Sequence, residues 1–238
     1  MDATIREGQA PAVVISLAPG ETLKSESGAM MFVSGDVTMD VEMPGGLTGG
    51  LKRKLLAGES LFLTTYTARG AGAVGITGPF PGSIRQVELD GELICEKHAY
   101  LGHVGEVEIE SVSARSLGAG FTGGGEGFFL QRLKGKGTLW IHGGGDFIDF
   151  DLAEGQTMQV DTGCMVAVEP TVRYEVKLQG GLTKSLFGGE GLFLVHFTGP
   201  GKVTLQTLPF SRTARRVLAA AGGRGQDEKG GLLSTLMS

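Results

Sequence analysis

The sequence predicts an all-β protein built from three repeated units. Glycine is the outlier of the composition, at 42 of 238 residues, against a usual share of about 7%. These glycines separate short apolar runs, which is typical of many strands joined by tight turns. A related stretch of sequence occurs three times, and a helical pattern is expected only after residue 210.

The repeat is clearest in residues 57–76, 124–143 and 188–207, which align without a gap. Each copy has a Gly-Glu pair, a phenylalanine three residues after the glutamate and a second glycine eleven residues after it. The repeated glycines and glutamates are Gly58, Glu59 and Gly70, then Gly125, Glu126 and Gly137, then Gly189, Glu190 and Gly201. Fixed-period similarity of this kind indicates a repeat architecture.

Each copy is interpreted as a strand, a Gly-rich turn and a return strand, so that the nine repeated residues mark structural turns. The second glycine would adopt a positive φ, and the glutamate would accept backbone N–H bonds from the turn. The register predicts buried core positions for Phe62, Phe129 and Phe193. A phosphate-binding loop is not expected, because no helix pattern follows any copy.

Further upstream, residues 17–30 align with 152–165, while the middle copy, residues 89–102, is one residue shorter and has His98 in place of a glycine. Each unit alone would expose an apolar sheet face, so the three are expected to close around a pseudo-threefold axis, in a manner similar to a double-stranded β-helix.

The chain is therefore expected to form one β domain over residues 1–210, with repeats at about 13–84, 85–150 and 151–210. Residues 211–238 should form a short helix with a basic end, from Arg212 to Ala221, followed by a Gly-rich tail.

Composition limits the class of protein. The net charge of −5 and the pI near 5.4 make nucleic-acid binding unfavourable, because such binding needs a basic surface. Two cysteines cannot form a disulfide framework, which favours a reducing compartment. The start of the chain has no signal-peptide pattern, and no apolar run approaches the roughly 20 residues of a membrane span. A soluble, cytoplasmic protein is expected.

The residues that could hold a metal ion gather in one segment and are Cys95, His98, His103 and Glu106. Only Cys95 and His98 have a zinc-like spacing, and no second ligand pair follows. We therefore expect no metal site and no cofactor.

Three further features of the sequence bear on chemistry. Glu106, Glu108 and Glu110 should share one solvated strand face, since residues two apart point the same way. No nucleophile motif is recognisable, because Ser60 is not in a G-x-S-x-G context. The basic residues 52–54 could touch a membrane surface, although they are few for lipid recognition.

Several of these segments together resemble one protein family. "SESGAM" at 25–30, "LKRKLLAGESLF" at 51–62 and "LFGGEGLF" at 186–193 are similar to the family called altered inheritance of mitochondria twenty-four, and the resemblance runs from about Val13 to Phe210. It implies sheet units like those of the tryptophan RNA-binding attenuation protein (a TRAP-like fold), a prokaryotic member, and a mitochondrial-biogenesis family without known catalytic residues.

The sequence thus favours a non-enzymatic binding or assembly protein with an undefined protein partner. The resemblance also implies rings built edge to edge, so we expect a homo-oligomer, a trimer rather than a dimer. The alternatives are an RNA-binding module, by analogy of fold, and an enzyme binding a metal or small molecule in the middle repeat.

Overall fold

The computed structural model describes residues 1–42, 63–112, 129–178 and 193–221. These residues form antiparallel β-sheets and one short C-terminal helix, residues 210–221. The predicted all-β class and the C-terminal helix are therefore confirmed. Within the described part of the chain, no helix is long and apolar enough to cross a membrane.

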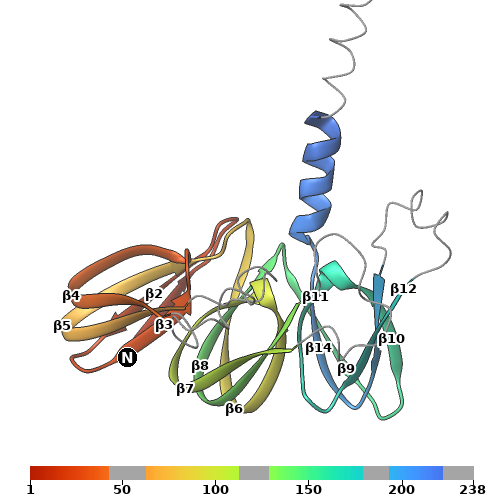
Figure 1. Cartoon of the computed structure of the whole chain (residues 1–238), viewed down its shortest axis with the longest axis horizontal. Helices are drawn as coiled ribbons and strands as arrows, with labels where there is room; N and C mark the ends of the chain where they lie inside the picture. The colour runs from red at the N-terminus through yellow and green to blue at the C-terminus, as the bar shows by residue number, and fades with distance from the viewer. Residues whose placement is uncertain (43–62, 113–128, 179–192, 222–238) are drawn as a thin grey trace, which may run out of the picture.

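The strands fall into three groups that follow one another along the long axis of the molecule (Figure 1). The first group is β1 (Asp2–Arg6), β2 (Ala12–Leu17), β3 (Thr22–Glu26), β4 (Met30–Glu42) and β5 (Leu63–Thr77). The second group is β6 (Gly82–Glu96), the 3-10 turn η1 (Lys97–Ala99), β7 (Tyr100–Val112) and β8 (Leu130–Gly144). The third group is β9 (Phe147–Leu152), β10 (Thr157–Asp161), the 3-10 turn η3 (Thr162–Cys164), β11 (Met165–Val168), β12 (Arg173–Leu178), β13 (Phe193–Thr198) and β14 (Gly201–Gln206).

Within each group the strands pair in the same plan. The last strand of the group is central: β5 pairs with β2 and β3 on one side and with β4 on the other, and β8 lies between β6 and β7. In the third group the central strand is divided, so that β14 lies between β9 and β11, and β13 between β10 and β12.

A register shift recurs near the start of one strand in each group: β4, β7 and β11. It falls between Met30 and Phe32 in β4, between Tyr100 and Gly102 in β7, and between Met165 and Ala167 in β11. These shifts give a structural alignment of the three groups that does not depend on sequence similarity. The closure of the groups around a pseudo-threefold axis stays a prediction.

The predicted turns at Gly70 and Gly137 are wrong. Each glycine lies inside a continuous strand of 15 residues, β5 or β8. A Cβ at Gly137 would collide with the backbone oxygen of Val104 on the paired strand β7, so this glycine is explained by close strand approach and not by a turn. Gly201 alone of the three has a positive φ, of 133°.

The other repeated residues predicted at turns lie outside the described residues: Gly58, Glu59, Gly125, Glu126, Gly189 and Glu190. The same holds for Phe62 and for the basic residues 52–54. Phe129 and Phe193 are half-buried, so the prediction that they occupy buried core positions is wrong for these two. The Lys97 Nζ lies 5.7 Å from the centroid of the Phe129 ring.

The buried core extends across the boundaries between groups. Ile84, Leu101 and Trp140 of the second group pack in a cluster formed mainly by the first group. Ile94 and Leu130 of the second group pack with the third. Burial of apolar area is the main favourable term in folding, so the described groups form one folded body.

Candidate functional site at the joints between strand groups

The first and second groups are joined edge to edge by strand pairing. β3 pairs antiparallel with β7, and the opposed residues are Leu23 and Val104, Lys24 and His103, and Ser25 and Gly102. Leu23, Ser25 and His103 are buried. The joint is therefore a backbone ladder with little access to solvent.

The second and third groups are joined in the same way. β6 pairs antiparallel with β11, and the opposed residues are Ile94 and Val168, and Cys95 and Ala167, all four of them buried. In both joints the later group contributes the residues that immediately follow its register shift. The two joints thus use equivalent positions of their groups.

A buried polar pair lies in the first joint. The Tyr100 hydroxyl is 2.7 Å from Nδ1 of His103 and 3.3 Å from the backbone oxygen of Lys24 in β3. Burial, with a contribution from the nearby Lys24, lowers the pKa of His103 to about 4. Burial likewise raises the pKa of Tyr100. Both side chains are therefore neutral at pH 7; they bond to each other within β7, and the bond from Tyr100 to Lys24 crosses the joint.

Two carboxyl groups, one at the end of a strand of each joint, lie near each other. Glu26 ends β3, and Glu96 ends β6, where its carboxylate accepts a hydrogen bond of 2.8 Å from the backbone N–H of His98. Burial raises the pKa of Glu26 to about 7, against the opposing effect of Lys97. Burial also raises the pKa of Glu96 to about 7, the His98 bond opposes this, and the nearby charge of Glu26 adds to it. Carboxyls that titrate near neutrality can exchange protons at physiological pH.

Cys95 is fully buried in β6, where it stands opposite Ala167 in the second joint, and it is near enough to these carboxyls to feel their charge. Burial raises the pKa of its thiol, and the charges of Glu96 and Glu26 act in the same direction. A thiol with a raised pKa is a poor nucleophile, because the thiolate is the reactive form. The groups near this joint that can bind or release a proton near neutral pH are therefore the carboxyls of Glu26 and Glu96.

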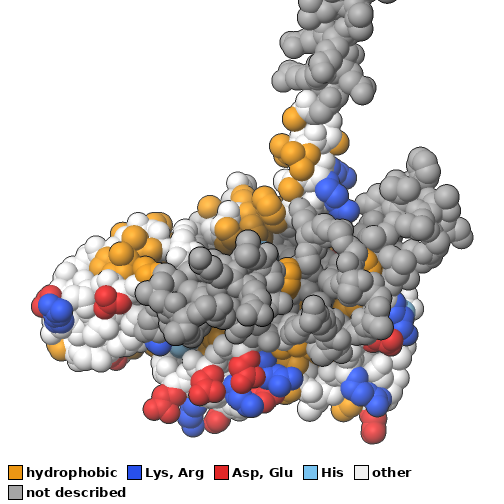
Figure 2. Space-filling model, in the orientation of Figure 1, with side chains coloured by type: hydrophobic (Ala, Val, Ile, Leu, Met, Phe, Trp, Pro, Cys, Tyr) orange, Lys and Arg blue, Asp and Glu red, His pale blue; other side chains and the backbone are white. Residues whose placement is uncertain are grey.

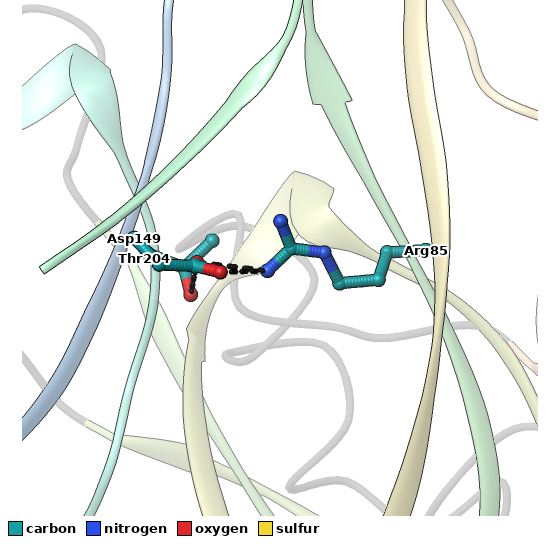
Figure 3. Close-up of polar contacts among 3 residues, drawn as sticks. All are labelled: Arg85, Asp149 and Thr204. Carbon is teal, nitrogen blue, oxygen red and sulfur yellow. Dashed lines mark hydrogen bonds and ion pairs between the residues drawn. The ribbon is translucent and has the colours of Figure 1, made fainter.

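The second joint carries an ion pair that connects its two groups (Figure 3). Nη1 of Arg85 in β6 lies 2.8 and 2.9 Å from the two carboxylate oxygens of Asp149 in β9, and Thr204 in β14 donates to the same carboxylate at 2.8 Å. The Arg85 guanidinium also lies 4.6 Å from the centroid of the Phe147 ring. Although burial acts to raise it, the bonds from Arg85 and Thr204 hold the pKa of Asp149 below its ordinary value.

An open pocket borders the first joint and is lined by Met1, Leu17, Glu21, Thr22, Val104 and Gly105. The ammonium group of Met1 lies 2.7 Å from Oε1 of Glu21. This bond, with a second from the backbone N–H of Ala18, lowers the pKa of Glu21. The carboxylate is thus engaged within the chain.

The four residues considered as metal ligands do not form one site. Cys95 is buried in β6, His103 is bound to Tyr100, and His98 and Glu106 are exposed. Across residues 1–42, 63–112, 129–178 and 193–221, no three His, Cys, Asp or Glu side chains converge so as to hold a metal ion.

The three carboxylates predicted to share a strand face do so. Glu106, Glu108 and Glu110 are exposed and stand opposite Lys136, Lys134 and Arg132 of β8. On the other side of β8, Lys136 and Lys134 pair with Asp90 and Glu92, both at 3.2 Å. Figure 2 shows acidic and basic side chains mixed along this edge of the molecule. Such exposed pairs contribute little energy, and the face is a solvated one.

Glu26, Glu96 and Tyr100 were not predicted from the sequence as members of a site. A signal for the carboxyls is present in the alignment of residues 17–30, 89–102 and 152–165, where an acid precedes the same turn in each copy: Glu26, Glu96 and Asp161. The Asp161 carboxylate accepts a 2.9 Å bond from the backbone N–H of Gly163, as Glu96 does from His98. In the second and third groups the recurring acid therefore caps a 3-10 turn, η1 or η3.

The fold and its joints define a class of all-β proteins in which sheets are joined at their edges along a single chain. Residues 3–208 match the mitochondrial biogenesis AIM24 family, and the chain belongs to that family. An uncharacterized protein of Streptococcus pyogenes serotype M6 is 28% identical over 223 residues, with 90% of this chain and 89% of the relative covered. A crystal structure of a protein from Streptococcus pyogenes superposes with a TM-score of 0.77 at 26% identity, covering 92% of this chain and 99% of that one. Both relatives are bacterial, in agreement with the predicted prokaryotic membership.

Proposed function

We propose that this chain is a non-enzymatic assembly protein whose β scaffold binds other chains through its strand edges. The observation that carries the proposal is the repeated joint. Two pairs of strand groups are connected by the same stretches of their strands, β3 with β7 and β6 with β11. A surface that joins units twice within one chain is suited to joining further units of the same kind.

The perturbed polar groups support a structural role and not catalysis. Tyr100 and His103 make hydrogen bonds to groups of the first joint, and Glu96 accepts one from the adjacent turn η1. A catalytic acid or base has to reach the proton of a substrate, directly or through one water molecule. The buried thiol of Cys95 has a raised pKa, which is unfavourable for a nucleophile.

The proposed assembly is a homo-oligomer in the cytoplasm, with three copies favoured, and the three strand groups of each copy serve as repeats of one unit. Light scattering coupled to size exclusion tests this at micromolar concentrations. We expect a mass near three times 24.8 kDa. A mass that stays at that of a single chain over the whole concentration range would overturn the proposal.

A further inference from the structure

Strand edges equivalent to those in the two joints remain at the two ends of the molecule. Each group joins the next group along the chain through one strand segment: β3 in the first group and the end of β6 in the second. The equivalent segment of the third group is β10. Each group joins the preceding group through another segment, the start of β7 in the second group and of β11 in the third. The equivalent segment of the first group is the start of β4. In the described part of the chain, β10 pairs only with β13, and β4 only with β5.

The equivalence holds residue by residue. Residues 22–26 and 157–161 have the same register against their central strands, since Leu23 stands opposite Tyr66 and Met158 opposite Phe197. The register shifts align Val33 with His103. In the first joint His103 stands opposite Lys24, whose equivalent in β10 is Gln159. A joint formed by the end strands would therefore place Gln159 opposite Val33.

Side chains at the two end edges are more exposed than their equivalents inside the joints, as expected where a neighbouring strand is absent. Leu23 in the first joint is fully buried, whereas its equivalent Met158 is half-buried. Val168 in the second joint is 1% exposed, whereas its equivalent Val33 is half-buried. Beside Val33, the methionines at the start of β4 are 41% and 50% exposed. Apolar side chains at these edges would lose solvent contact if a strand were added.

The two edges carry neither charges nor prolines against pairing, and the register shift between Met30 and Phe32 in β4 recurs in β7 and β11, which both pair with a further strand just beyond it. Exposed edges in natural proteins carry charges, prolines or bulges that block a further strand. Residues 30–34, "MMFVS", and 157–160, "TMQV", contain no charged residue and no proline. Figure 1 shows β4 and β10 at opposite ends of the molecule, so the neighbour that reaches both is a second copy of the chain.

We propose, building on the assembly function above, that β10 of one copy pairs antiparallel with the start of β4 of the next copy, with Gln159 opposite Val33 and Val160 opposite Phe32. The contact is head to tail, because two different edges meet. Repetition of such a contact closes into a ring when the rotation between copies allows it, as in the trimer proposed above. Main-chain hydrogen bonds supply its affinity, and the apolar side chains at both edges are covered.

Disulfide trapping tests the register. The variant is Val33→Cys/Gln159→Cys in a Cys164→Ala background, which removes the half-buried native thiol and leaves the buried Cys95. Residues directly opposite in antiparallel strands have Cβ atoms about 4.5–5.5 Å apart, close to what a disulfide requires, while diagonal neighbours are about 7–8 Å apart. Under mild oxidation we expect intermolecular bands at multiples of the chain mass on non-reducing gels, reversed by a reductant.

The matched control is Val33→Cys/Thr157→Cys, which shifts one cysteine by two residues along the same face of β10, where Thr157 and Gln159 are both exposed. Severalfold less cross-linking is expected for the control and for each single variant. If light scattering shows an oligomer and the pair cross-links no better than the control, the assembly proposal stands and the inferred register is wrong.

Two other outcomes also decide the question. A cross-link formed within one chain, at the mass of the monomer, would show that the chain closes its own ends, and the pairing between copies would be refuted. A single-chain mass by light scattering without any cross-link would refute both this inference and the proposed function. Circular dichroism of each variant establishes that it is folded before these results are interpreted.

Discussion

Replacement of Glu96 by glutamine should stabilise the protein at pH 8 and have little effect at pH 5. Glutamine resembles the neutral carboxyl and keeps an oxygen that can accept the bond from the His98 N–H. In the folded protein the pKa of Glu96 is raised from 4.5 to about 7, first by burial. At pH 8 the native carboxyl is therefore charged in an environment that disfavours the charge, and the variant avoids this cost.

The size of the effect follows from the two pKa values. A rise from 4.5 to about 7 corresponds to about 3 kcal/mol of disfavoured charge at pH 8, since each tenfold change in proton affinity is about 1.4 kcal/mol. The carboxyl is partly exposed, so solvent screening reduces the effect, and we expect the variant to gain about 1–2 kcal/mol. A group with a raised folded pKa contributes its full stability below the unfolded pKa and loses it as the pH rises through the folded pKa, here between 4.5 and about 7.

Urea denaturation followed by tryptophan fluorescence measures this, because the chain has one tryptophan, Trp140, and it is fully buried. His103 has the opposite dependence, since its lowered pKa makes stability increase with pH between about 4 and 6.5. Comparison with the parent protein at each pH removes this contribution. Glu108→Gln on the exposed strand face is the control and should show no change between the two pH values. Destabilisation by Glu96→Gln at pH 8, or an equal effect at both pH values, would refute the assignment of a buried charge at the joint.

Two other perturbations follow from the packing. Gly137→Val should lower the unfolding free energy by about 1–3 kcal/mol, because its Cβ would overlap the backbone of Val104. Gly70→Ala should lower it by less, since the Cβ there meets only the Asp36 side chain, at 3.2 Å. Equal denaturation midpoints for the two variants would contradict this difference. A double-mutant cycle of Arg85→Ala and Asp149→Ala should give a coupling energy of about 0.5–1 kcal/mol at pH 7. This coupling should be lost as the pH falls through the lowered pKa of Asp149. A coupling energy of zero at pH 7 would show that the second joint does not depend on this pair.

The sequence was sufficient to predict the strand content and the C-terminal helix, because both depend on local patterns. Short apolar runs between glycines predict strands, and the segment from Arg212 to Ala221 has strong helix formers followed by Gly222 and Gly223. Helix is found at residues 210–221. The alternation that placed Glu106 to Glu110 on one solvated face is likewise a property of any strand, and it is confirmed.

The Gly-rich turns could not be told from continuous strands by the same reasoning. A hairpin and a long strand with central glycines have the same local sequence pattern. In both cases strand-forming residues lie on each side of a glycine such as Gly137. Which of them forms depends on the neighbours, because both halves of β8 pair with the single strand β6, from Gly82 to Glu96. These contacts come from residues far away in the sequence, and local propensity carries no information about them.

The joint was missed for a related reason. Cys95, His98 and His103 are near one another in the sequence, and this proximity made them candidates for a metal site, although no metal site was predicted. In the structure Cys95 stands opposite Ala167 in the second joint, while His103 stands opposite Lys24 in the first. The two strands that carry them, β6 and β7, lie on opposite sides of β8. A strand presents its two edges to different neighbours, so residues close in sequence can belong to separate joints. This is also why edge strands, more than clusters of reactive side chains, are where the function of this chain has to be tested.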